Sequence, residues 1–88
     1  MIPAFDAERP YRLNPRVALR PEPFGALAYH FGNRRLSFLK APELVELVSG
    51  LEGHRSVTEA LAEVPGRRRD ASLRALASLA AADMIIPQ

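Results

Sequence analysis

Hydrophobic and polar residues alternate through the block Val17–Lys40, in runs interrupted by turn-forming residues. An alternation of period two predicts half-buried strands, which we place at residues 16–20, 26–31 and 34–40. Pro21–Gly25 contains two prolines and a glycine, which favour a turn. Gly32-Asn33 is typical of a two-residue hairpin loop. The three strands are therefore predicted to form one antiparallel sheet.

The Gly32-Asn33 turn fixes a register for the second hairpin, because a two-residue loop pairs Tyr29 with Leu36. The same register collects four apolar side chains on one face: Leu27, Tyr29, Leu36 and Phe38. The opposite face carries Ala28, His30, Arg35 and Ser37. Because a slip of one residue would mix the two sets, we predict that the apolar face packs on the core.

The second half of the chain follows a helical period. Pro42 suits the first position of a helix that Gly50 or Gly53 ends. Ser56-Val-Thr-Glu59 has the pattern of a capping box and opens a second helix. Asp70 is expected to cap a third, alanine-rich helix. The predicted fold class is α+β: a three-stranded antiparallel sheet followed by a three-helix, winged-helix-like bundle.

The chain has 88 residues, the size of one small domain. Three prolines and no periodicity mark residues 1–15 as an extended N-terminal arm, so we assign residues 16–88 to a single domain. Met84-Ile-Ile86 is expected to close the domain as a hydrophobic tail.

Composition excludes several functions. Without cysteine the chain cannot hold an iron–sulfur cluster or a cysteine-based zinc site, and the absence fits a cytoplasmic protein. Its apolar runs are too short to span a membrane. His30 and His54 have no partner at metal-ligand spacing, so we interpret both as ordinary surface histidines. Without a nucleophile–base pair or a phosphate-binding loop, we expect neither an enzyme nor a bound cofactor or metal.

Charge bears on the nucleic-acid alternative. Residues 1–40 carry seven cations and three anions, net +4, whereas residues 41–88 carry five arginines and seven acids, net −2. A small winged-helix nucleic-acid binder would read DNA with its last helix, and Arg67–Arg69 precedes that helix. The helical half is nevertheless net negative, which disfavours this alternative; the three arginines are then a solvated loop.

The edge of the third predicted strand is the strongest indication of function. Pro15 and Pro21 flank the first strand and protect its edge, but the third strand has no proline before Pro42. An open strand edge offers unpaired N–H and C=O groups to which a guest peptide can add a strand. The alternative is an edge without function, or one covered by the N-terminal arm or by a second copy of the chain.

Two motifs resemble a known family. Pro15-Arg-Val-Ala-Leu-Arg20 and Ser56-Val-Thr-Glu59, in a β-β-β-α-α-α order, resemble the PqqD-like peptide chaperones, also called RiPP recognition elements. Within that group, Val17–Lys40 is most similar to the chaperones of mycofactocin systems. The resemblance implies a non-catalytic protein. It would bind the leader of a ribosomally made precursor peptide and present it to a radical S-adenosylmethionine maturase, which acts on the C-terminal Val-Tyr of the precursor.

The resemblance also implies where the leader binds. In the wider group the leader adds to the third strand and lies against the third helix. On the strand side the implied site residues are Arg35, Leu36, Ser37, Phe38, Leu39 and Lys40. On the helix side they are Leu73, Arg74, Leu76, Ala77 and Ala80. Iron–sulfur clusters and S-adenosylmethionine belong to the partner enzyme. A monomer and a dimer are both compatible with the sequence.

Overall fold

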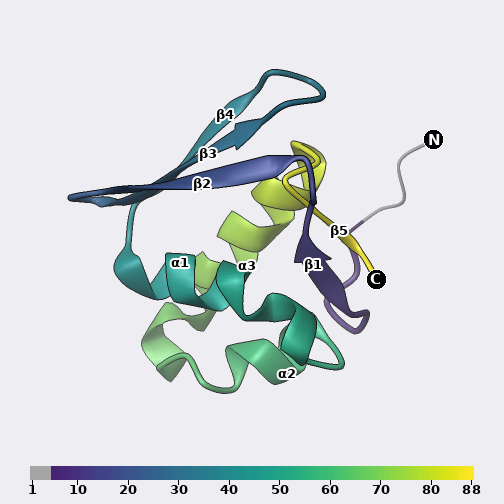
Figure 1. The fold of residues 1–88 in the computed structure, drawn as a ribbon. Coiled ribbons are helices and arrows are strands. Elements are labelled where there is room, and N and C mark those ends of the chain that lie inside the picture. Colours follow the sequence, from purple (N-terminus) through teal and green to yellow (C-terminus); the bar gives the residue numbers. More distant parts are fainter. Residues whose placement is uncertain (1–4) are drawn as a thin grey trace.

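The structure is a computed structural model that describes residues 5–88, and it combines antiparallel sheets with helices (Figure 1). The expected α+β class is therefore confirmed. The first four residues of the predicted N-terminal arm lie outside the described residues. The strands are β1 (Tyr11–Leu13), β2 (Val17–Glu22), β3 (Gly25–His30), β4 (Leu36–Leu39) and β5 (Ile85–Pro87). The helices are α1 (Pro42–Ser49), the 3₁₀ turn η1 (Leu51–Gly53), α2 (Val57–Leu61) and α3 (Gly66–Ala81).

The predicted three-stranded sheet is present, with the order β2-β3-β4. The predicted register is confirmed, because Tyr29 pairs with Leu36 and Leu27 pairs with Phe38. The predicted two-residue loop is wrong. Residues 31–35 separate the two strands, and Arg34 in this loop has a left-handed φ of 62°. The register is kept despite the longer loop, because the same pairing extends one position beyond the two strands. There the N–H of His30 donates to the Arg35 carbonyl at 3.0 Å.

The predicted orientation of the sheet is wrong. Leu36 and Phe38 are 55% and 59% exposed, whereas Ala28 and Leu39 are buried. The core therefore lies against the face that has smaller side chains. Ala26 and Ala28 leave room for Val48 of α1 and Leu76 of α3, in the same buried cluster. An alternating pattern separates two faces, but it does not say which one meets the helices.

The turn between β2 and β3 depends on Gly25. This residue has φ +146°, and a Cβ added there would lie 2.1 Å from the Leu39 carbonyl oxygen. Only glycine allows β4 to approach this closely.

A second, two-stranded sheet joins the two ends of the chain. β1 pairs with β5, with Leu13 opposite Ile85, and in Figure 1 these strands lie side by side (purple and yellow). Periodicity gave no sign of this pair, because each strand has only three residues. The segment before β1 packs beside α2. There the N–H of Val57 donates to the Arg9 carbonyl, and the N–H of Thr58 donates to the Ala7 carbonyl.

The helix starts were predicted well for α1 and α2. Pro42 opens α1, and Gly50 is its C-cap residue. The capping box opens α2, since the N–H of Glu59 donates to Ser56 Oγ at 3.0 Å. The start of α3 was predicted wrongly: the helix begins at Gly66 after Pro65, so Arg67–Arg69 form its first turn instead of a loop.

Candidate functional site: the free edge of β4

β4 lies at one edge of the β2-β3-β4 sheet, and within residues 5–88 no strand pairs with its outer side. In an antiparallel pair the backbone groups of successive residues point alternately toward and away from the neighbouring strand. The Arg35 carbonyl accepts a hydrogen bond from His30 of β3, so Arg35, Ser37 and Leu39 direct their backbone groups toward β3. Leu36 and Phe38 consequently direct their N–H and C=O groups to the open edge.

The opposite edge of the sheet, at β2, is partly protected. The Phe31 N–H donates to the Arg16 carbonyl, so by the same alternation Val17, Leu19 and Pro21 direct their backbone groups outward. The Val17 N–H is already bonded to the Asn14 carbonyl at 2.9 Å, and Pro21 has no N–H. The prediction that proline protects this edge agrees with the pairing, and β4 is the more open of the two edges.

The strand-side residues of the predicted site divide between the two faces of β4. Leu36 and Phe38 project from the face that the helices do not cover, and Lys40 follows at the next position of that alternation. Ser37 is half-buried on the helix-facing side, and Leu39 is fully buried there. Leu39 can therefore contribute its backbone and its packing to the site, but not an accessible side chain.

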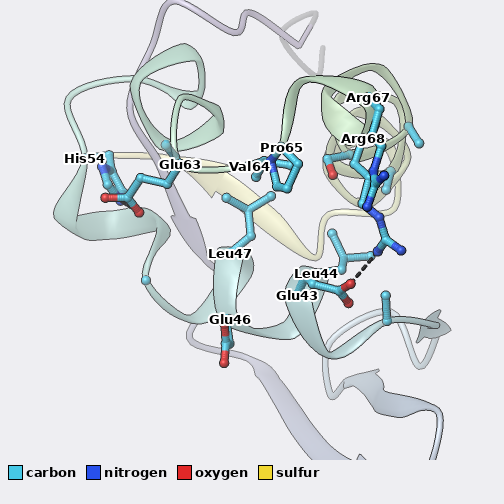
Figure 2. A pocket seen from close by; sticks show the side chains of 16 residues that line it. Glu43, Leu44, Glu46, Leu47, His54, Glu63, Val64, Pro65, Arg67 and Arg68 are labelled. Atoms are coloured by element: carbon cyan, nitrogen blue, oxygen red, sulfur yellow. Dashed lines mark hydrogen bonds and ion pairs between the residues drawn. The ribbon is translucent and has the colours of Figure 1, made fainter.

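A pocket of about 670 Å³ opens beyond the end of β4, between α1 and the N-terminal half of α3. It is lined by Ala41 next to the strand, by Leu44 and Leu47 of α1, and by Ala71 and Ala75 of α3. Figure 2 shows Leu47 pointing toward Val64 and Pro65. The small side chains of Ala71 and Ala75 fill little of the space between the two helices.

Charged residues lie at both ends of the pocket. Glu43 and Arg68 form an ion pair across one end, drawn as a dashed line in Figure 2. At the other end, His54 Nε2 lies 3.9 Å from Glu63 Oε2 and His54 Nδ1 lies 3.3 Å from Glu59 Oε1. The pKa of Glu59 is lowered, chiefly because its carboxylate accepts the Arg55 N–H, with His54 as a further cause. These pairs leave the pocket mixed in charge, with an apolar centre.

The helix-side residues predicted for the site do not line this pocket. Leu76 is fully buried, and Leu73 and Ala80 pack against the core. By helical periodicity Ala77 lies on the same side as Leu73, while Arg74 is exposed. The α3 residues that line the pocket are instead Arg67, Arg68, Ala71, Ser72 and Ala75. The strongest stripe of apolar residues on α3 identifies the side that meets the core, so it could not identify the side that meets the pocket.

The interpretation of His30 as a surface residue is wrong. His30 is 3% exposed, and its Nδ1 accepts the N–H groups of Gly32 and Asn33 at 2.9 and 3.1 Å. The ring proton therefore lies on Nε2, which donates to Asp83 Oδ2 at 3.0 Å. Asn14, also buried, donates to the same carboxylate oxygen at 3.1 Å. The cluster fixes the β3–β4 loop against the end of α3. Its members are far apart in the sequence, so no local pattern shows it.

Two of the three arginines that suggested nucleic-acid binding are engaged within the protein. Arg68 pairs with Glu43, and Arg69 donates to the carbonyl groups of Leu61, Ala62 and Val64 at the end of α2 and just after it. The described residues contain no group of three or more histidine, cysteine or acidic residues placed to bind a metal. None of the described helices is both long and apolar enough to cross a membrane.

Comparisons with known proteins give a consistent result. The sequence matches the model of the peptide chaperone MftB family over residues 10–86. It is 47% identical over 87 residues to the peptide chaperone MftB of Mycobacterium ulcerans, covering 97% of this chain and 80% of that protein. Identity to the proteins of the same name is 45% over 86 residues for Mycobacterium tuberculosis (96% and 79% covered) and 46% over 85 residues for Mycolicibacterium smegmatis (94% and 83% covered). No solved structure gives a significant match.

Proposed function

The chain belongs to the peptide chaperone MftB family, and from this membership we propose that it binds the leader of a ribosomally made precursor peptide by strand addition to β4. It then presents the bound peptide to a radical S-adenosylmethionine maturase in mycofactocin biosynthesis. The family and these relatives are named for a chaperone role, which is not catalytic. In the same proposal the fold is PqqD-like, the helices form a winged-helix-like bundle, and the protein acts in the cytoplasm.

The observation that carries the proposal is the open edge of β4. Leu36 and Phe38 direct their backbone groups to that edge, and a guest strand would satisfy them with hydrogen bonds worth about 0.5–1.5 kcal/mol each. Alternate guest side chains would lie on the two faces of the extended sheet. One set would point toward the helix-facing side of the sheet, and the predicted α3 contacts lie on that side. The other set would lie beside Leu36 and Phe38.

Charge and tethering complete the proposal. Arg34, Arg35 and Lys40 are exposed beside the edge and favour an acidic leader. Arg74 and the half-buried Ala77 remain predicted contacts on the helix side. A chaperone that holds the precursor and the maturase together raises the effective concentration of the peptide at the enzyme.

Titration of the ¹⁵N-labelled protein with unlabelled leader peptide tests the proposal. We expect amide shift changes along Leu36–Lys40, because these residues form the open edge, and at Arg74 and Ala77, the predicted contacts on α3. An absence of shift changes in both regions at saturating peptide contradicts the proposal.

A proline substitution tests strand addition itself. Leu36→Pro removes an N–H that points to the open edge, so the hydrogen bonds between β3 and β4 remain intact. We expect leader affinity to fall about tenfold, the effect of one lost backbone hydrogen bond. Leu36→Val is the matched control, because it changes the side chain and keeps the N–H. Equal affinity of a folded Leu36→Pro protein and this control rules out strand addition at β4.

A further inference from the structure

The face of the β2-β3-β4 sheet opposite the helices gathers exposed aromatic and aliphatic side chains. Among the described residues the large exposed hydrophobic side chains are Phe24, Phe31, Leu36 and Phe38, with 40–64% of their surface accessible. Leu36 and Phe38 belong to this face through their strand positions. Phe24 and Phe31 are in the two hairpin turns and pack against residues of the same face. We call Phe24, Leu27, Tyr29, Phe31, Leu36 and Phe38 the outer face.

The rings of the outer face pack against one another in two pairs. The Phe24 and Phe38 rings lie 5.9 Å apart between centroids, and Tyr29 and Phe31 form an edge-to-face pair at 5.0 Å. Both pairs connect a turn to a strand whose register is fixed. Aromatic residues that are exposed and clustered are typical of protein interfaces, because they contribute a large contact area. None of these side chains belongs to the buried core or packs against it, because the core lies on the opposite face of the sheet.

The charge around the outer face selects the kind of partner. Residues 16–40, which build the sheet, carry five cations and one anion, net +4. The anion, Glu22, is paired with Arg20 at 3.1 Å. All five cations are exposed. By strand alternation Arg16, Arg20 and Lys40 lie on the side of the outer face, Arg34 lies in the β3–β4 loop, and Arg35 lies on the helix-facing side. A second copy of the chain would bring two such positive faces together, which like-charge repulsion disfavours. A partner surface with an apolar centre and an acidic rim complements the outer face.

We infer that the outer face is the docking surface for a globular protein partner with an acidic rim. This inference rests on the proposed function, in which that partner is the maturase that receives the peptide. The outer face is perpendicular to the open edge, so the chaperone can hold the leader at β4 and the enzyme on the sheet at the same time. A guest strand would also widen this face from three strands to four, because its outward side chains would lie beside Leu36 and Phe38. Bound leader therefore strengthens docking, and by linkage the enzyme strengthens leader binding.

Two binding measurements on each variant test the inference: affinity for the purified maturase and affinity for the isolated leader peptide. The double variant Phe24→Ser/Phe31→Ser removes two rings in the turns and leaves the β4 backbone intact. We expect maturase affinity to fall at least tenfold, as for central aromatic residues of interfaces, and leader affinity to stay within about twofold. Thermal unfolding checks that the double variant is folded. If it is not, the charge variants in the next paragraph decide.

Charge reversal provides the matched pair. Arg20→Glu changes an exposed cation of β2, whereas Arg55→Glu makes the same change before α2, away from the outer face. Only Arg20→Glu should weaken maturase binding, and the loss should shrink at high salt.

Unchanged maturase affinity in the aromatic double variant and in Arg20→Glu overturns the inference. So does a wild-type dimer that Phe24→Ser/Phe31→Ser dissociates, because a second copy would then occupy the face. If the wild-type protein binds no leader, the proposed function fails. If it binds the leader but the variants keep wild-type maturase affinity, only the docking inference fails.

Discussion

His30 and Asp83 together join three segments that are distant in the sequence. Asp83 follows α3 with a left-handed φ of 62°, and the next N–H, of Met84, donates to the Leu79 carbonyl at 2.8 Å. Glycine usually occupies such a position after a helix, because other residues are strained there. Unlike glycine, Asp83 provides a carboxylate, which accepts hydrogen bonds from His30 and Asn14. One aspartate thus ends α3 and fixes the loop that leads into β4.

Replacing His30 tests this cluster. We expect His30→Ala to lower the free energy of unfolding by about 2 kcal/mol or more, because it leaves the N–H groups of Gly32 and Asn33 without their acceptor and creates a cavity. Urea denaturation measures the loss. His54→Ala is the control: His54 pairs with Glu59 near the surface, and its removal should cost much less. Equal losses in the two variants would show that the buried His30 cluster stabilises the fold no more than the His54–Glu59 pair does.

The strands show what a sequence pattern can and cannot determine. Alternation and turn residues were enough for the β3–β4 register, since only one register separates the two sets of side chains. They could not determine which set faces the helices, because that depends on how closely α1 and α3 approach Ala26 and Ala28. The open β4 edge was predictable from the absence of proline. The α3 side of the pocket was not, because the stripe of leucines points into the core.

The first turn of α2 makes stability depend on pH. Glu59 has a lowered pKa because its carboxylate accepts the Arg55 N–H, so the folded protein holds this proton less tightly than the unfolded chain does. The stabilisation is complete above the unfolded pKa, near pH 4, and is lost as the pH falls through the lower folded value. We expect Glu59→Gln to lose less stability than the wild type between about pH 6 and about pH 3 in urea denaturation.

Ser56→Ala is the control for that experiment. It removes the oxygen that accepts the Glu59 N–H but leaves the titrating carboxylate in place. It should cost about 1 kcal/mol at both pH values. If Glu59→Gln and the wild type lose stability in parallel as the pH falls, the cap does not carry the pH dependence.

At the scale of the whole molecule, the small β1–β5 sheet closes the fold. Tyr11 is buried and pairs with Pro87, and the Gln88 side chain donates to the carbonyl groups of Tyr11 and Glu52. The same end of the chain therefore contacts β1 and η1. A domain of 88 residues buries a small core, so each long-range contact of this kind accounts for a large share of its stability. Propensity could not reveal the pair, because two three-residue strands become stable only when they meet.

Neighbouring isoleucines in β5 allow a matched test of this closure. Ile85 is 1% exposed and belongs to the buried cluster, whereas Ile86 points the other way and is half-buried. We expect Ile85→Ala to lower the free energy of unfolding by about 2–5 kcal/mol, which a marginally stable domain barely tolerates. Ile86→Ala removes the same atoms and should cost clearly less, by the same urea measurement.

Because β4 and the outer face lie on the other sheet, a folded Ile85→Ala protein should still bind leader and maturase with wild-type affinity. Loss of binding without unfolding would instead couple the two sheets, and the β1–β5 sheet would then be part of the binding mechanism.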